Sequence, residues 1–175
     1  MKTCNSCGSI AQRPPSQVTA TTVDMILELL ALAALVLCFA IPLAALSRLP
    51  DTIPAHFNLR GEVDGYGSKR TILYPLPVAG VLYIALTILS RHPRIYNYAV
   101  EITEKNAQVQ YRLATRLVRL LKLVAMLTFS FLEYLMVISA FGHHKTMAAI
   151  SFGPVVLVVI LGSLAYYICR SVKAK

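Results

Sequence analysis

Acidic and histidine side chains are the residues of this chain that could carry chemistry, and they are few. The chain has eight Asp and Glu and four His, and Glu133 is the one acid deep inside a long apolar run. A carboxyl group is costly inside a bilayer, so it must face protein or water, and a functional site is the default hypothesis. Two interpretations stay open: a proton or ion site, or a neutral glutamic acid that is hydrogen-bonded to a neighbouring span.

Five further residues between the apolar runs carry groups that bind zinc, because imidazole and carboxylate are zinc ligands. They are His56, Glu62, Asp64, His143 and His144. Their spacing matches no metal signature, and irregular loops use the same side chains as hydrogen-bond partners. The sequence therefore favours a structural role, with a zinc site at His56, His143 and His144 as the alternative.

No catalytic motif accompanies these residues. We find no nucleophile with a base at a defined spacing, no HExxH and no phosphate loop. Cys4 and Cys7 form a single CxxC, whereas a zinc ribbon needs a second pair. We therefore expect no enzyme, no cofactor and no nucleic-acid partner, and two reduced thiols in the tail, with a metal shared between two copies as the alternative.

Basic residues gather on one face of a long helix, within about 120° of its surface. They are Arg112, Arg116, Arg119 and Lys122. This stripe either anchors the helix at the lipid surface or docks an acidic or phosphate-bearing partner. Glu133 lies on the same face, and an acid facing lipid is costly. We therefore expect the face to turn inward, where Glu28 can pair with Lys122 or Arg119.

The elements that position these groups are membrane spans. Apolar residues make up 57% of the chain and charged residues 14%, against roughly 25% in soluble domains. About 20 apolar residues cross a bilayer, and four runs qualify: residues 25–46, 71–90, 117–141 and 148–169. The sequence predicts an all-α integral membrane bundle at residues 23–170. A disordered tail (residues 1–22) precedes it and a basic tail (residues 171–175) follows.

Lys and Arg counts predict the orientation of the bundle. The side with the tails and the second loop, counted through the start of the third span to Lys122, carries twelve of these residues, and the side with the first and third loops carries five. Both termini are then cytoplasmic in a multi-pass protein of the cell membrane, beside anionic lipids. With Thr103 as its N-cap, the third helix would occupy residues 104–141, or ~57 Å at 1.5 Å per residue. The hydrocarbon takes ~30 Å, so this helix is expected to extend into the cytoplasm.

The first loop, residues 49–68, is polar and rich in turn-forming residues. Pro50 and Pro54 disfavour helix, and Gly61, Gly65 and Gly67 supply positions for positive φ. We expect a compact, irregular, extracytoplasmic structure. Its candidate ligand or motif residues are Pro50, Asp51, Pro54, His56, Phe57, Asn58, Gly61, Asp64, Tyr66, Gly67 and Ser68.

This loop carries a resemblance to a known family. The segment LPDTIPAHFNLRGEVDGYGSK, followed by a proline-led span, resembles the shared segment of a bacterial membrane family known only as a domain of unknown function. The same segment occurs in SdpI-like proteins, which give immunity to a secreted toxic peptide and take part in signalling. Residues 97–122 are similar to the family's second loop, so the resemblance covers about residues 25–140.

Three functional hypotheses follow for this chain. The resemblance implies a non-enzymatic membrane protein that recognises a peptide or envelope ligand outside the cell. A small transporter or accessory subunit that uses Glu133 is the second hypothesis. A structural envelope protein without a ligand is the third.

Overall fold

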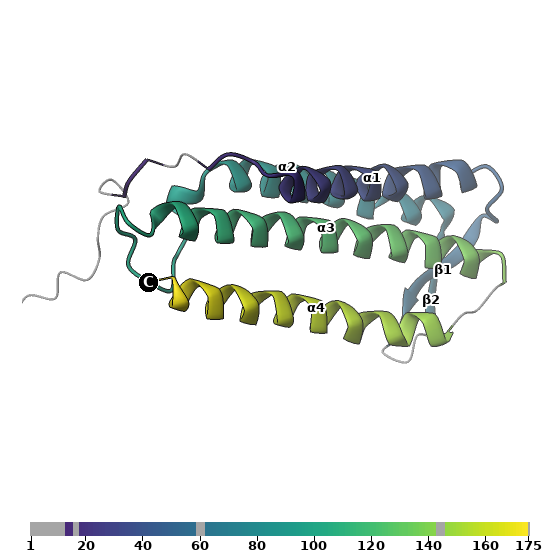
Figure 1. The fold of residues 1–175 in the computed structure, drawn as a ribbon. Helices are drawn as coiled ribbons and strands as arrows, with labels where there is room; N and C mark the ends of the chain where they lie inside the picture. The colour runs from purple at the N-terminus through teal and green to yellow at the C-terminus, as the bar shows by residue number, and fades with distance from the viewer. Residues whose placement is uncertain (1–12, 16–17, 59–61, 143–145, 175) are drawn as a thin grey trace, which may run out of the picture.

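The computed structural model describes residues 13–15, 18–58, 62–142 and 146–174. Four long helices run antiparallel to their sequence neighbours: α1 (Thr22–Ala45), α2 (Pro75–Arg91), α3 (Ala107–Ala140) and α4 (Thr146–Lys173) (Figure 1). Between α1 and α2 lie the strands β1 (Thr52–Phe57) and β2 (Val63–Ser68) and the short 3-10 helix η2 (Lys69–Leu73). A second 3-10 helix, η3 (Pro93–Ile95), follows α2.

These helices confirm the expectation of a mostly helical multi-pass membrane protein. The described residues contain four helices that are long and apolar enough to cross a membrane. The strands lie at one end of the bundle, which we call the hairpin end. The C-terminus and the connection from α2 to α3 lie at the other, which we call the termini end (Figure 1).

A capping box begins the first helix. Thr21 is the N-cap of α1. The Thr21 hydroxyl accepts a hydrogen bond from the Asp24 backbone N–H, and the Asp24 carboxylate accepts one from the Thr21 N–H at 2.9 Å. This reciprocal capping box satisfies two N–H groups that the helix leaves free.

The third helix is shorter than predicted but still exceeds the bilayer. It begins at Ala107 and not at residue 104, because the Asn106 side chain accepts a hydrogen bond from the Thr103 N–H at 2.9 Å and holds that stretch as a turn. It ends before Gly142, whose φ of 83° is in the left-handed region that terminates helices. Its 34 residues span ~51 Å, well beyond a ~30 Å hydrocarbon layer.

The predicted irregular loop is instead an antiparallel hairpin of β1 and β2. Ile53 pairs with Gly67 and Phe57 pairs with Val63, with irregular register on both sides of His56. The prolines and glycines are compatible with strands here, because proline is tolerated on an edge strand and glycine allows close backbone approach. Gly65 and Gly67 do not have positive φ, so their expected turn role is wrong; Gly61 lies outside the described residues.

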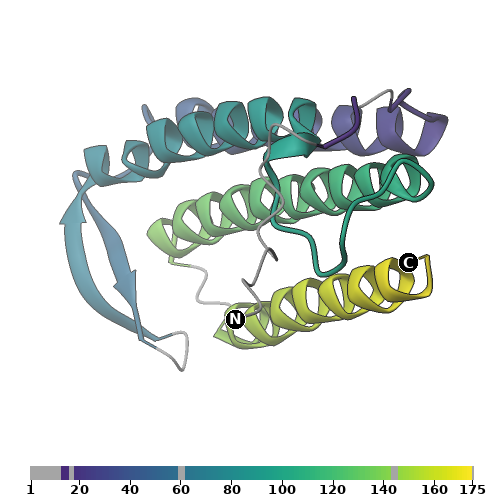
Figure 2. The same cartoon turned by 90° about the vertical axis from the view of Figure 1, so that its left-hand side faces the viewer.

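The hairpin is anchored at its base to the helices. Leu49, Ile53 and Ile72 form a buried cluster. Side chains of α1 and α3 pack against it, among them Ala45, Met136 and Val137. An isolated two-stranded hairpin is marginally stable in water, so this burial is what fixes its position. Figure 2 shows the strands projecting past the helices at the hairpin end.

Helix α3 is central, since it contacts each of the other three helices. Small residues of α1 (Ala31, Ala34 and Cys38) are buried, which allows helices to approach closely in a membrane. Ser130 of α3 donates a hydrogen bond to the Ala34 carbonyl at 2.6 Å. These contacts position the α1 and α3 faces that carry the charged residues described next.

Candidate functional site

Five charged residues connect α1 and α3 in an alternating series that we call the charge ladder. Its members are Asp24 and Glu28 of α1 and Arg116, Arg119 and Lys122 of α3. Each carboxylate is shared by two cations. Asp24 Oδ1 lies 3.3 Å from Arg116 Nε and 3.1 Å from Arg119 Nη1. Glu28 binds Arg119 Nε at 3.2 Å and accepts a short hydrogen bond from Lys122 Nζ.

Lys122 is the buried end of this ladder. Its side chain is 0% exposed, and its Nζ also donates to Thr87 Oγ1 of α2 at 3.0 Å. The same Nζ lies 4.7 Å from the centre of the Tyr83 ring, which adds a cation–π contact. A buried charge needs such partners, so Lys122 joins α1, α2 and α3 at one point.

The structure shows how far each residue of the basic stripe is buried. Exposure rises along the stripe from Lys122 (0%) through Arg119 (13%) to Arg116 (38%), and Arg112 is exposed. The predicted pairing of Glu28 with Lys122 and Arg119 is confirmed. A lipid-facing stripe is therefore wrong for Arg119 and Lys122.

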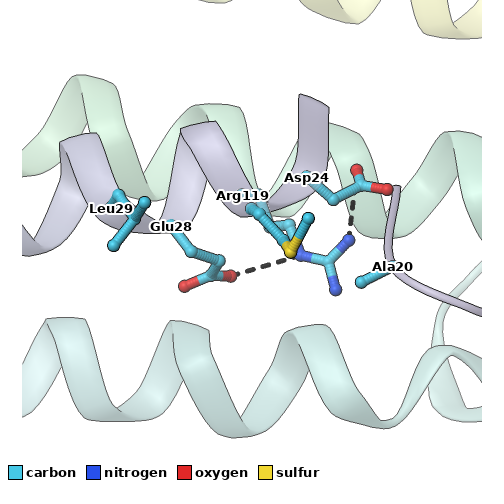
Figure 3. A pocket seen from close by; sticks show the side chains of 6 residues that line it. Ala20, Asp24, Glu28, Leu29 and Arg119 are labelled. Carbon is cyan, nitrogen blue, oxygen red and sulfur yellow. Dashed lines mark hydrogen bonds and ion pairs between the residues drawn. The ribbon is translucent and has the colours of Figure 1, made fainter. Parts of the chain in front are cut away.

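Asp24 is the member of the ladder that sequence reasoning missed. Its buried carboxylate both caps α1 and binds two guanidinium groups. The available signal was its spacing from Glu28, because residues four apart lie on the same helix face. A pocket of about 270 Å³ opens beside Asp24, Glu28 and Arg119; Figure 3 shows Arg119 reaching both carboxylates.

Glu133 lies on the same helix face, nearer the hairpin end. It is 0% exposed, so it faces protein as expected. Neither carboxyl oxygen has a hydrogen-bond partner among the described residues, so the bond to a neighbouring span, one of the two open interpretations, is not seen there. One turn away, Ser130 is satisfied by backbone carbonyls. An unpartnered carboxyl group in this position can take up a proton or a cation.

The hairpin presents a second set of polar groups at its surface. His56 Nδ1 and Asp64 Oδ1 lie 2.5 Å apart across the strands, and both side chains are exposed. Asp51 Oδ1 lies 2.9 Å from Lys69 Nζ, and this hydrogen bond lowers the pKa of the Asp51 carboxyl. Tyr66 is 67% exposed. These side chains lie where a ligand could reach them.

Other residues of the loop motif have structural positions. Pro54 is buried, Pro50 is exposed and Phe57 is half-buried. The Asn58 side chain donates to Glu62 Oε2 at 2.9 Å, next to the strand connection. Ser68 accepts hydrogen bonds that start η2. The motif thus divides into exposed groups and groups that shape the hairpin.

The zinc hypothesis gains no support from the part of the chain that the structure describes. No group of three or more potential ligands converges there, and His56 is paired with Asp64. His143, His144, Cys4 and Cys7 lie outside the described residues.

Near the termini end, the chain before α1 is bonded to the α2–α3 connection. Arg13 Nη1 donates to the carbonyls of Arg94 and Tyr96, each at 2.6 Å, and Arg94 Nη2 donates back to the Arg13 carbonyl. Tyr96 donates to the Leu89 carbonyl at 2.7 Å. Burial raises the pKa of Tyr96 to about 12. This connection is therefore held by hydrogen bonds to main-chain oxygens.

Comparison with known proteins finds similarity for part of the chain. Residues 33–81 match a family described as "Domain of unknown function (DUF1648)". An "Uncharacterized protein" of Archaeoglobus fulgidus is 31% identical over 74 residues, which are 38% of this chain and 40% of the relative. The chain therefore spans less than half of that relative's length. No solved structure matches.

The family match covers the hairpin but not the charge ladder. Residues 33–81 contain the end of α1, both strands and the start of α2. Every ladder residue and Glu133 lie outside this range. Four apolar helices and the matched segment together indicate a multi-pass membrane protein, of which residues 33–81 are similar to a domain of unknown function.

Proposed function

We propose that this protein is a non-enzymatic membrane protein, similar to SdpI-like immunity and signalling proteins, that recognises an extracytoplasmic peptide at the β1–β2 hairpin. The main observation in support is that the hairpin is fixed at its base, while its two outer strand edges are open. Ile53 and Ile72 are 0% exposed, whereas no described segment pairs with either outer edge of the two strands.

An open strand edge is a binding surface for an extended peptide. Backbone N–H and C=O groups on the edge supply affinity, and nearby side chains supply specificity. Here the exposed side chains are His56, Asp64 and Tyr66. The basic residues at the termini end predict that the hairpin faces outside, where a secreted peptide would meet it.

Sensitivity of cells to secreted peptides tests this proposal. Deleting the gene should sensitise cells to a peptide that the wild-type gene resists, and the wild-type gene should restore protection. Tyr66→Ala should fail to protect at normal protein levels. Tyr74→Ala is the matched control, because Tyr74 is 69% exposed but lies outside the strands. Unchanged sensitivity after deletion would contradict the proposal.

The sidedness of the hairpin is tested separately by cysteine labelling. In a protein without its native cysteines, Ser68→Cys should react with an impermeant thiol reagent from outside. Lys105→Cys should react only after the membrane is opened, because Lys105 is exposed and lies just before α3, at the termini end. Labelling of both from one side would refute the topology.

One observation favours a second function, a small transporter or accessory subunit that uses Glu133. The carboxyl group is fully buried and has no hydrogen-bond partner among the described residues, and intramembrane acids often mark ion or proton paths. Proteoliposomes that carry the wild type would then pass protons or cations. Glu133→Gln would abolish that flux while preserving the fold. Equal flux from both proteins would exclude this role.

A further inference from the structure

The charge ladder is unbalanced, and its surplus positive charge lies at Arg116. Three cations share two carboxylates. The Lys122 end is closed by Glu28, Thr87 and the Tyr83 ring. Arg116, at the other end, pairs with the Asp24 carboxylate that Arg119 also contacts, and its Nη2 donates a hydrogen bond to Thr21 Oγ1 at 3.1 Å. Its Nη1 has no partner among the described residues, so the alternating series can accept one more anion there.

Arg116 also lines a groove between α3 and α4. The groove has a volume of about 280 Å³. Its α3 wall is formed by Arg116 and three leucines, Leu113, Leu117 and Leu120. Its α4 wall is formed by Ser163, Tyr166 and Tyr167. The leucines follow the i, i+4, i+7 spacing of one helix face. The groove is therefore apolar along its length with a cation on one wall.

Two contacts between α3 and α4 lie on either side of the groove. At the termini end, Gln110 and Ser171 exchange hydrogen bonds, including Ser171 Oγ to Gln110 Oε1 at 2.6 Å. Toward the hairpin end, the rings of Phe131 and Phe152 stack with centres 4.0 Å apart. Between these contacts the small Ser163 faces the α3 leucines. The space is thus bounded by contacts at both ends.

An anionic phospholipid fits this groove better than a soluble anion. The apolar walls suit an acyl chain, and a phosphate accepts hydrogen bonds from guanidinium groups. Tyrosine is typical of the membrane–water interface, and Tyr166 is 61% exposed. Apolar side chains exposed on α4, including Leu161 and Leu164, face lipid in a spanning helix. A lipid can therefore enter from the side.

We propose that the α3–α4 groove holds one anionic phospholipid from the leaflet at the termini end. Its phosphate binds Arg116, and an acyl chain lies along Leu117 and Leu120. The phosphate would continue the alternation of the charge ladder, and the acyl chain would fill the space between the two helices. This site does not depend on the peptide proposed for the hairpin.

Native mass spectrometry of the purified protein tests the site with two lipids of equal chain length, phosphatidylglycerol and phosphatidylcholine. The wild type should retain one phosphatidylglycerol in preference to phosphatidylcholine. Arg116→Gln should lower this preference about tenfold, the effect of one charge-assisted contact. Arg112→Gln is the matched control, because Arg112 is an exposed cation one turn away that does not line the groove.

A second variant tests the groove without altering charge. Ser163→Phe fills the space from α4 and should prevent retention of either lipid, whereas Leu161→Phe on the exposed face of α4 should not. This arm remains decisive if Arg116→Gln fails to fold. Equal retention of the two lipids by the wild type would overturn the proposal. Competition by inorganic phosphate together with normal binding to Ser163→Phe would also overturn it, because both would indicate a soluble-anion site.

Discussion

Removing the carboxylate of Glu28 should destabilise the protein far more than removing the ammonium group of Lys122. Glu28→Gln leaves a cation that is 0% exposed without a paired counter-charge among the described residues, because Thr87, the Tyr83 ring and the new amide group are all neutral. Breaking a buried pair in this way costs ~3–5 kcal/mol. Lys122→Met leaves an acid that is 32% exposed and still bound to Arg119 at 3.2 Å. That change should cost about 1 kcal/mol or less.

The double variant makes this prediction sharper. Glu28→Gln with Lys122→Met removes both charges, and a buried pair replaced by uncharged groups of similar volume is often neutral or stabilising. The double variant should therefore be more stable than Glu28→Gln alone. The corresponding coupling energy is ~2–3 kcal/mol, and it should change little with salt because the pair is poorly screened.

Unfolding in mixed detergent micelles, followed by circular dichroism, measures these differences; the chain has no Trp for fluorescence. Arg112→Gln is the control and should stay within about 0.5 kcal/mol of the wild type, since Arg112 is exposed. Equal costs for Glu28→Gln and Lys122→Met, or additive effects in the double variant, would refute the burial and sharing described for the ladder.

The remaining predictions concern other parts of the molecule. Glu133→Leu should raise the free energy of unfolding by ~1–3 kcal/mol, because it removes a buried polar group without a partner; a loss of stability would reveal a partner for the acid. Gly67→Val should lower the yield of folded protein, because a Cβ there lies 3.0 Å from Thr71 Oγ1, whereas Gly162→Val, where a Cβ meets nothing within 4 Å, should not. Burial raises the pKa of Tyr96 to about 12, above ~10 for an exposed tyrosine. The part of the free energy of unfolding that depends on this protonated hydroxyl is therefore complete below pH ~10 and is lost as pH rises through about 12. Tyr96→Phe should flatten this fall in stability when unfolding is measured against pH.

The sequence could predict the spans and one shared face because both depend on local regularities. Length and apolar content define a membrane-crossing helix, and all four predicted runs lie mainly within observed helices. Pro75 begins α2, where its missing N–H is tolerated. Helical periodicity puts Lys122 and Glu133 on one face, and the cost of an acid in lipid turns that face inward. The pairing with Glu28 followed from these two facts.

Tertiary structure decided how separate elements meet. Asp24 binds Arg116 and Arg119, which are more than 90 residues away in the chain, and no local pattern encodes that distance. Pro54 and Gly67 are compatible with both an irregular loop and a hairpin, and the packing of Ile53 against α1 and α3 selects the hairpin.

Tertiary structure also determined the groove between α3 and α4 and the lack of partners, within the described part of the chain, for the carboxyl oxygens of Glu133. Each depends on which side chain of a neighbouring helix lies opposite, and that is set by how the helices cross. Periodicity along one chain segment determines which residues share a face. Only packing determines what that face meets, so the sequence determined the candidate residues and the tertiary structure determined their partners.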